Sequence, residues 1–171
     1  KTDLYIFYSG HGVPDPNSKE AYYVPYDFDP YSIVQTGYSL KNFYNQIGTL
    51  STRSTTIVID ACFSGSSEKG MVIQSASPVF LTVKNPVINI TNGAVFTSST
   101  SQQISSWYHQ KKHGLFTYYF LLGMQGKADV NNDGQVTVYE MESYLGKNVS
   151  QQARRLYNRE QTPEITGAKD R

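Results

Sequence analysis

Apolar residues along the chain follow two kinds of pattern: short runs of β-forming residues, and longer stretches with helical spacing. Runs rich in β-branched and aromatic residues, each bounded by turn-forming residues, predict buried strands. We expect these strands over residues 3–9, 21–24, 55–59 and 94–99. Pro25 ends the second strand, because proline cannot donate to a strand ladder.

Three stretches carry apolar residues at the spacing of one helical face. The first covers residues 39–47, with apolar positions at 40, 43, 44 and 47, and Ser39 is placed to act as its N-cap. Further helical segments are predicted over Leu115 to Met124 and, as one or two helices, over Val136 to Tyr157. Strands that alternate with helices predict an α/β fold with doubly wound layers.

Turn-forming residues mark the connections between these elements. Residues 13–18 form a turn-rich loop in this prediction, and residues 27–30 form a second polar turn. The longest irregular stretch, residues 66–92, is rich in serine and contains Pro78 and Pro86. We expect it to be a surface loop that holds one short hairpin.

Composition and charge favour a single ordered domain and exclude several kinds of partner. A chain of 171 residues is long enough to bury a continuous core. Its 15 basic and 14 acidic residues leave a net charge of +1. Neither nucleic acid nor an acidic membrane is therefore expected as a partner. No apolar run reaches the length that a bilayer span requires.

Two predicted strands end in reactive side chains. Residues 4–9 run through Gly10 into His11, and residues 56–61 run into Cys62, the only cysteine of the chain. Functional groups gather beyond the carboxyl ends of parallel strands, so an imidazole and a thiol are expected in one crevice. A lone cysteine also excludes an intramolecular disulfide.

This pair has the chemistry of a cysteine hydrolase. A thiol is mostly protonated at neutral pH, and His11 can serve as the base that activates Cys62 and later protonates the leaving amine. Gly12 has no side chain, so a substrate can approach its backbone N–H, which together with the N–H of Cys62 can bind the oxyanion. The alternatives are an inert core thiol and a hydrogen-bonded loop histidine.

The other two histidines are not expected to be catalytic. Neither His109 nor His113 ends a buried strand. His113 stands directly before Gly114 and the predicted helix, where it is expected to mark the entry to the helix or cap it. These two positions therefore favour the interpretation as ordinary loop histidines.

The two motifs together resemble the caspase/metacaspase superfamily of cysteine peptidases, in particular its bacterial metacaspase and orthocaspase members. The sequence YSGHG at residues 8–12 and DACFSG at residues 60–65 carry the resemblance, with the reactive residues 51 positions apart (62 minus 11). It continues through the residue ranges 23–27, 114–118 and 161–164. The resemblance implies a caspase-like three-layer sandwich with a mostly parallel central sheet flanked by helices, spanning residues 1–171 as one peptidase domain.

The resemblance also implies roles for single residues. His11 and Cys62 match the catalytic dyad, and Gly12 matches the oxyanion glycine. Metacaspases carry an aspartate two positions before the cysteine and a serine two positions before the histidine, here Asp60 and Ser9, which line the S1 pocket. A carboxylate there attracts a basic side chain, so we expect cleavage after Arg or Lys and not after Asp. A further acidic S1 residue of metacaspases lies on an early strand that this chain lacks.

Asp60 has a competing interpretation. A carboxylate at the end of a strand also serves as a cap for a loop or a helix. The sequence leaves both roles open, and the offset of two residues from Cys62 favours the pocket.

Residues 129–140 satisfy the twelve-residue EF-hand pattern. Oxygen ligands fall at its first, third and fifth positions, a backbone carbonyl at the seventh and a bidentate glutamate at the twelfth. These residues are Asp129, Asn131, Asp133, Gln135 and Glu140. Gly134 permits the sharp turn. The prediction is a Ca²⁺ site; the alternative is a plain turn held by side-chain-to-backbone hydrogen bonds. No cofactor is expected for catalysis.

The leading interpretation is a cysteine endopeptidase acting on proteins or peptides with a basic P1 residue, modulated by calcium and self-processing. Residues 66–92 follow the nucleophile, where family members often carry a processing linker, and Lys69 and Lys84 are its basic residues. The alternatives are a calcium-binding interaction module on a catalytically silent caspase-like fold, and a hydrolase of small amides or esters.

The abrupt start of the chain at Lys1, almost directly in a strand, predicts that the first strands belong to a preceding segment of the same protein. The remaining questions stay open at this point. The resemblance to bacterial enzymes is compatible with the bacterial cytoplasm, the periplasm or secretion, and the oligomeric state is not indicated.

Overall fold

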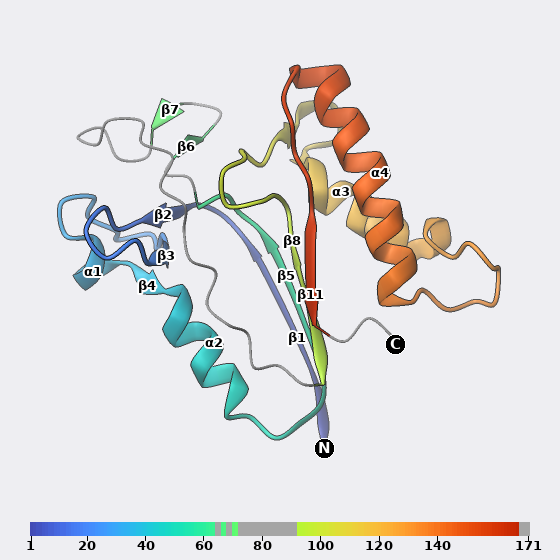
Figure 1. Ribbon diagram of the computed structural model, residues 1–171, viewed down its shortest axis with the longest axis horizontal. Helices are drawn as coiled ribbons and strands as arrows, with labels where there is room; N and C mark the ends of the chain where they lie inside the picture. The colour runs from blue at the N-terminus through green and yellow to red at the C-terminus, as the bar shows by residue number, and fades with distance from the viewer. Residues whose placement is uncertain (64–65, 68–69, 72–91, 168–171) are drawn as a thin grey trace.

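The computed structural model describes residues 1–63, 66–67, 70–71 and 92–167 (Figure 1). Its centre, among the described residues, is a four-stranded sheet with the order β1-β5-β8-β11. The first three strands are mutually parallel, and β11 is antiparallel to β8. The strands span Thr2–Ser9 (β1), Thr52–Asp60 (β5), Gly93–Thr97 (β8) and Glu164–Gly167 (β11). This arrangement confirms the predicted α/β class with a mostly parallel sheet.

Helices cover both faces of the sheet and give the molecule three layers (Figure 1). Strand β5 lies inside the sheet, and Ile57, Val58 and Ile59 are at most 1% exposed. Val58 packs in the cluster that includes α3 and α4, whereas Ile57 and Ile59 pack in the cluster that includes α2. A strand buried on both faces reads as a continuous apolar run, which is why residues 57–59 carry no polar side chain.

Helix α2 (Leu40–Gly48) covers one face of the sheet. The Ser39 hydroxyl accepts a hydrogen bond from the backbone N–H of Asn42 at 3.3 Å, which confirms the predicted N-cap. The helix buries Leu40, Tyr44 and Ile47 against the sheet. The spacing of these residues is the one from which the helix was predicted.

Helices α3 (Leu115–Leu122) and α4 (Val138–Tyr157) cover the other face (Figure 1). The helix predicted over Leu115 to Met124 is α3, followed directly by a π-helical turn over Gly123–Lys127. Within this turn, Gly126 leaves the helical conformation, with a φ of +97°. A conformation of this kind is open mainly to glycine. The predicted region 136–157 forms one helix, whose buried positions include Leu145 and Val149.

A small antiparallel sheet lies beside the carboxyl end of β1. Its strands, in the order β2-β3-β4, are Gly12–Pro14, Ala21–Tyr23 and Tyr38–Ser39. The prediction of a loop over residues 13–18 was therefore wrong at its start, because Val13 and Pro14 pair with β3. Short strands of this kind form through pairing with distant residues rather than through their own pattern. Helix α1 (Ile33–Thr36) precedes β4.

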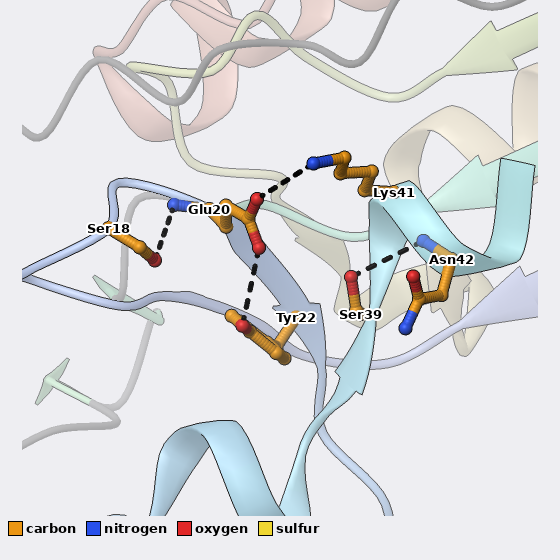
Figure 2. A network of polar contacts seen from close by, with 6 residues as sticks. All are labelled: Ser18, Glu20, Tyr22, Ser39, Lys41 and Asn42. Atoms are coloured by element: carbon orange, nitrogen blue, oxygen red, sulfur yellow. Dashed lines mark hydrogen bonds and ion pairs between the residues drawn. The ribbon is translucent and has the colours of Figure 1, made fainter. Parts of the chain in front are cut away.

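Polar contacts join this small sheet to the start of α2 (Figure 2). The Glu20 carboxylate forms an ion pair with the Lys41 ammonium at 3.4 Å and accepts a hydrogen bond from the Tyr22 hydroxyl at 3.5 Å. Both ends of the ion pair are exposed, so its contribution to stability is small.

The remaining short elements lie between the larger ones. The predicted hairpin inside residues 66–92 is confirmed by β6 (Ser66–Ser67) and β7 (Gly70–Met71); residues 64–65, 68–69 and 72–91 lie outside the described part of the chain. A second hairpin pairs β9 (Trp107–Tyr108) with β10 (His113–Gly114) around a 3₁₀ turn at His109–Lys111. His113 thus belongs to β10, and the N-cap of α3 is Gly114. No helix in the described ranges combines the length and the apolar character that a membrane crossing needs.

Candidate active site

The loops that follow β1 and β5 stay bonded to each other beyond the ends of both strands. Ser9 and Asp60 are register partners at the last pair of the parallel ladder. Beyond it, the N–H of Gly10 donates to the carbonyl oxygen of Asp60, and the N–H of Gly12 donates to the carbonyl oxygen of Cys62, both at 3.2 Å. His11 lies between these two bonds. The structure thus brings the predicted histidine and cysteine onto adjacent segments at the carboxyl edge of the sheet.

The backbone of His11 is fixed, while its side chain is exposed. Its carbonyl oxygen accepts hydrogen bonds from the N–H of Val24 at 3.0 Å and from the hydroxyl of Tyr8 at 2.8 Å. Burial raises the pKa of Tyr8 above its ordinary value. An imidazole held in this way can reach a bound substrate and exchange protons with solvent.

Cys62 is buried, with 6% of its surface exposed. Its neighbour Phe63 packs against Tyr23 with ring centroids 5.5 Å apart. Tyr23 is in contact with Tyr8 as well, at a centroid distance of 4.4 Å, so one aromatic cluster supports both reactive segments. The position of Cys62, the predicted nucleophile, is therefore set by packing rather than by an exposed loop.

Gly12 lies directly against the ring of Phe63, and a Cβ atom at this position would overlap the ring carbons. The close approach explains why the residue is glycine. Its N–H was expected to face the substrate as an oxyanion donor. In the structure this N–H donates to the carbonyl oxygen of Cys62, and that bond has to be exchanged before the group can bind an oxyanion.

Asp60 is buried, with 6% exposed, and its carboxylate accepts hydrogen bonds from two segments that the sequence did not connect with it. Oδ1 accepts from the Ser105 hydroxyl at 2.7 Å. Oδ2 accepts from the backbone N–H of Thr117 at 3.2 Å and from the Thr117 hydroxyl. No lysine, arginine or histidine of the described residues forms an ion pair with it.

The contacts of Asp60 correspond to the helix-cap interpretation. Thr117 is the third residue of α3, and the N-cap residue Gly114 has no side chain to accept its N–H. Asp60 supplies this acceptor from a neighbouring strand. The S1 role stays a prediction beside this cap, and the carboxylate lies two positions before Cys62 in sequence. Ser9, its register partner, is exposed.

Gln161 belongs to the same polar cluster and is 0% exposed. Its side-chain oxygen accepts from the N–H of Ser106 at 2.9 Å, and its Nε2 donates to the Ser98 carbonyl at 3.0 Å and to the Ser105 hydroxyl at 3.4 Å. Gln161 belongs to residues 161–164, one of the ranges that carry the family resemblance, and no separate role was predicted for it. Ser105 was not predicted as a site residue. Neither residue carries a local signal, because their partners are distant in sequence.

The predicted calcium-binding loop is held by hydrogen bonds from its own backbone N–H groups to its own side-chain oxygens. Asp129 accepts hydrogen bonds from the N–H groups of Asp133 and Gly134, at 3.2 and 3.0 Å. Asn131 and Asp133 accept from the N–H groups of Asp133 and Gln135, at 3.0 and 2.8 Å. Gly134, at the sixth position, has a φ of +81°, as the sharp turn requires.

Glu140, the twelfth position, forms a capping box with Thr137 at the start of α4. Its carboxylate accepts from the backbone N–H and the hydroxyl of Thr137 and from the N–H of Val130 at 3.1 Å. These bonds lower the pKa of Glu140. Among the described residues, no three His, Cys, Asp or Glu side chains are gathered as a metal site would require. The Ca²⁺ site stays a prediction.

Comparison with known proteins assigns the whole sheet and both strand ends to one family. The family model of the caspase domain matches residues 1–170. A search of curated proteins finds no match. The match covers both motifs at the carboxyl edge of the sheet and the segments that surround Asp60.

Proposed function

The chain belongs to the caspase domain family of cysteine peptidases, and on that basis we propose that it hydrolyses peptide bonds after a basic residue, with Cys62 as nucleophile and His11 as general base. The observation that carries the proposal is the pair of backbone bonds that place these residues on adjacent segments. His11 lies between the bond from Gly10 to Asp60 and the bond from Gly12 to Cys62.

The proposed reaction proceeds through a thioester. His11 takes the proton of the Cys62 thiol while Sγ attacks the carbonyl carbon of the scissile bond. The tetrahedral intermediate then breaks its C–N bond, and the imidazolium gives its proton to the leaving amine. Water, deprotonated by His11, attacks the thioester and releases the acid and the thiol.

The negative oxygen of the tetrahedral intermediate needs two donors. The N–H groups of Cys62 and Gly12 fill this role in the proposal. Because the N–H of Gly12 donates to the Cys62 carbonyl at 3.2 Å, the Cys62–Phe63 peptide has to turn when the substrate enters. Substrate binding is therefore coupled to a change at the nucleophile.

Asp60 supports a preference for a basic P1 residue. It is a buried carboxylate without a basic partner among the described residues, and it lies two positions before the nucleophile. Buried charges are normally paired, so a buried carboxylate at this position favours recognition of a cationic side chain of the substrate. An acidic P1 residue would be repelled there.

A panel of fluorogenic peptides tests the proposal. Peptides that differ only in P1 (Arg, Lys or Asp) are incubated with the unchanged protein, with Cys62→Ala and with His11→Ala. His109→Ala is the control for a histidine outside the site. We expect cleavage after Arg and Lys that is lost in Cys62→Ala and His11→Ala and kept in His109→Ala. Activity that survives Cys62→Ala, or a preference for Asp, contradicts the proposal.

We also propose that the loop at residues 129–140 binds Ca²⁺ and modulates the enzyme. Its residues fit the ion in type and spacing, and side-chain oxygens that accept one backbone N–H keep a further lone-pair position with which to bind the ion. Calorimetric titration with CaCl₂ should give heat of binding that is lost in Glu140→Gln, and peptidase activity should change on addition of EDTA. Absence of binding heat at millimolar CaCl₂ contradicts this part.

Self-processing in residues 66–92 is the remaining part of the proposal. The candidate sites, Lys69 and Lys84, lie outside the described residues, and the argument rests on their position after the nucleophile and on the proposed specificity. Intact-mass spectrometry during incubation should show cleavage after one of them, and none in Cys62→Ala. A single intact chain under conditions in which peptides are cleaved contradicts it.

A further inference from the structure

The hydrogen bonds around Asp60 leave its carboxylate with one open acceptor position. A carboxylate has two oxygens with about four lone-pair positions in total. The N–H and the hydroxyl of Thr117 occupy both positions of Oδ2. The Ser105 hydroxyl occupies one position of Oδ1 at 2.7 Å.

The oxygen that Thr117 binds is also enclosed. Gly114 lies against Oδ2 so closely that a Cβ atom at this position would overlap it, and Thr117 itself is 8% exposed. The remaining acceptor position is on Oδ1, on the side of Ser105, which is itself half-buried.

Gln161 fixes the direction of the bond between Ser105 and Asp60. The Ser106 N–H at 2.9 Å and the Ser98 carbonyl at 3.0 Å determine which end of the Gln161 amide is oxygen and which is nitrogen. Its second N–H then donates to the Ser105 hydroxyl at 3.4 Å, so the Ser105 proton is directed to Oδ1. Ser105 and Gln161 are positioning residues for Asp60.

We propose, on the basis of the proposed function, that this site recognises the P1 cation through a single contact with Oδ1 of Asp60, and that Ser105 and Thr117 limit it to that contact. An arginine side chain usually binds a carboxylate with two parallel N–H groups, one to each oxygen. Asp60 cannot form this pairing with both oxygens, because Oδ2 already accepts two hydrogen bonds from Thr117 and is enclosed by Gly114. A lysine ammonium needs one acceptor only, so lysine and arginine are recognised by charge and with similar efficiency.

The test compares kcat/KM for four peptides that differ in P1: Arg, Lys, and their uncharged analogues citrulline and norleucine. We expect Arg and Lys to agree within tenfold and both to exceed their uncharged analogues by a hundredfold or more. If chemistry is slow, calorimetric affinities for Cys62→Ala provide the same four-way comparison without turnover.

Neighbouring serines provide a matched pair of variants. Ser105→Ala opens the second position of Oδ1, where a guanidinium can place a second N–H and an ammonium cannot. The ratio of kcat/KM for Arg over Lys should therefore rise about tenfold, the equivalent of one hydrogen bond to a charged group. Ser106→Ala removes a buried hydroxyl that has no hydrogen-bond partner among the described residues, and should leave the ratio unchanged. A purely structural effect of Ser105→Ala would lower kcat/KM for the Arg and the Lys peptide equally.

The outcomes separate this inference from the function on which it rests. A preference for Arg over Lys above tenfold, with charged P1 residues still favoured, overturns the inference and leaves the proposed specificity intact. The same holds if the Arg-to-Lys ratio does not change in a folded Ser105→Ala protein. Equal cleavage of charged and uncharged P1 peptides overturns both.

Discussion

Gly12 is a position of the site that has no room for a side chain. Its backbone donates to Cys62, and its Cα lies against the ring of Phe63. A side chain at this position has to displace Phe63 or separate the two reactive segments. The spacing of the segments that carry His11 and Cys62 therefore depends on the absence of a side chain at Gly12.

We predict that Gly12→Ala lowers kcat/KM for a P1-Arg peptide by about a hundredfold, because misplacement of a catalytic group by about 1 Å has an effect of this size. Gly146→Ala is the control, since a Cβ there meets nothing within 4 Å. That helical substitution should keep activity and add roughly 0.5–1 kcal/mol of stability. Full activity in Gly12→Ala would contradict the close packing described for this position.

Asp60 contributes to stability through the cap it provides for α3. In Asp60→Asn, the amide offers one acceptor oxygen and an NH₂ group that faces donors from Ser105 or Thr117. We predict a loss of about 1–3 kcal/mol in the free energy of unfolding, the cost of a buried donor left without a partner. Urea denaturation of this variant in a Cys62→Ala background measures it. An unchanged midpoint would show that the cap is dispensable.

Among the secondary-structure elements, α4 depends on its capping box. The bonds from Thr137 lower the pKa of Glu140 relative to its ordinary value of 4.5. A lowered pKa in the folded state means that the charged carboxylate stabilises the fold above about pH 4.5. This stability is lost as the pH falls through the lowered pKa.

We predict that Glu140→Gln is less stable than the unchanged protein at pH 7 and that the difference is smaller at pH 3, because the contribution of the charged carboxylate is lost as the pH falls through its lowered pKa. Urea denaturation of both proteins at the two pH values, with EDTA present, measures the difference without a contribution from Ca²⁺. A difference of the same size at both pH values would contradict the role of the charge.

Several elements could be predicted because their signal is local. Ser39 and the apolar spacing after it define α2, and the apolar runs define β1 and β5 with their reactive ends. The strands β2 and β4 were not predicted, since elements of two or three residues are fixed by their partners. The cluster of Ser105, Asp60 and Gln161 was missed for the same reason: its hydrogen bonds join residues 45 and 56 positions apart.

At the scale of the whole molecule, the two larger apolar clusters of the described residues lie on opposite faces of the central sheet, and a smaller third cluster includes Val13, Tyr22 and Ile33. Leu145 of α4 is 0% exposed in the cluster that includes Val58, whereas Leu121 of α3 is 44% exposed. The sheet that carries both reactive segments is held in place by these clusters, so packing far from the site determines its geometry.

We predict that Leu145→Ala lowers the free energy of unfolding by about 2–5 kcal/mol, through lost burial and the cavity that remains. Leu121→Ala removes the same atoms from a partly exposed position and should change stability by no more than about 0.5 kcal/mol. Thermal and urea unfolding of both variants measure the contrast. Equal losses would contradict the assignment of α4 to the core.

Covalent labelling tests the central claim, that Cys62 and His11 form a peptidase site for basic residues, most directly. The protein is treated with a peptidyl acyloxymethyl ketone that carries Arg at P1, and with the matched Asp compound, and its intact mass is measured over time. We predict one adduct from the Arg compound, located at Cys62. Its formation should be slower in His11→Ala and absent in Cys62→Ala. Equal labelling by the Asp compound, or an adduct on a residue other than Cys62, would contradict it.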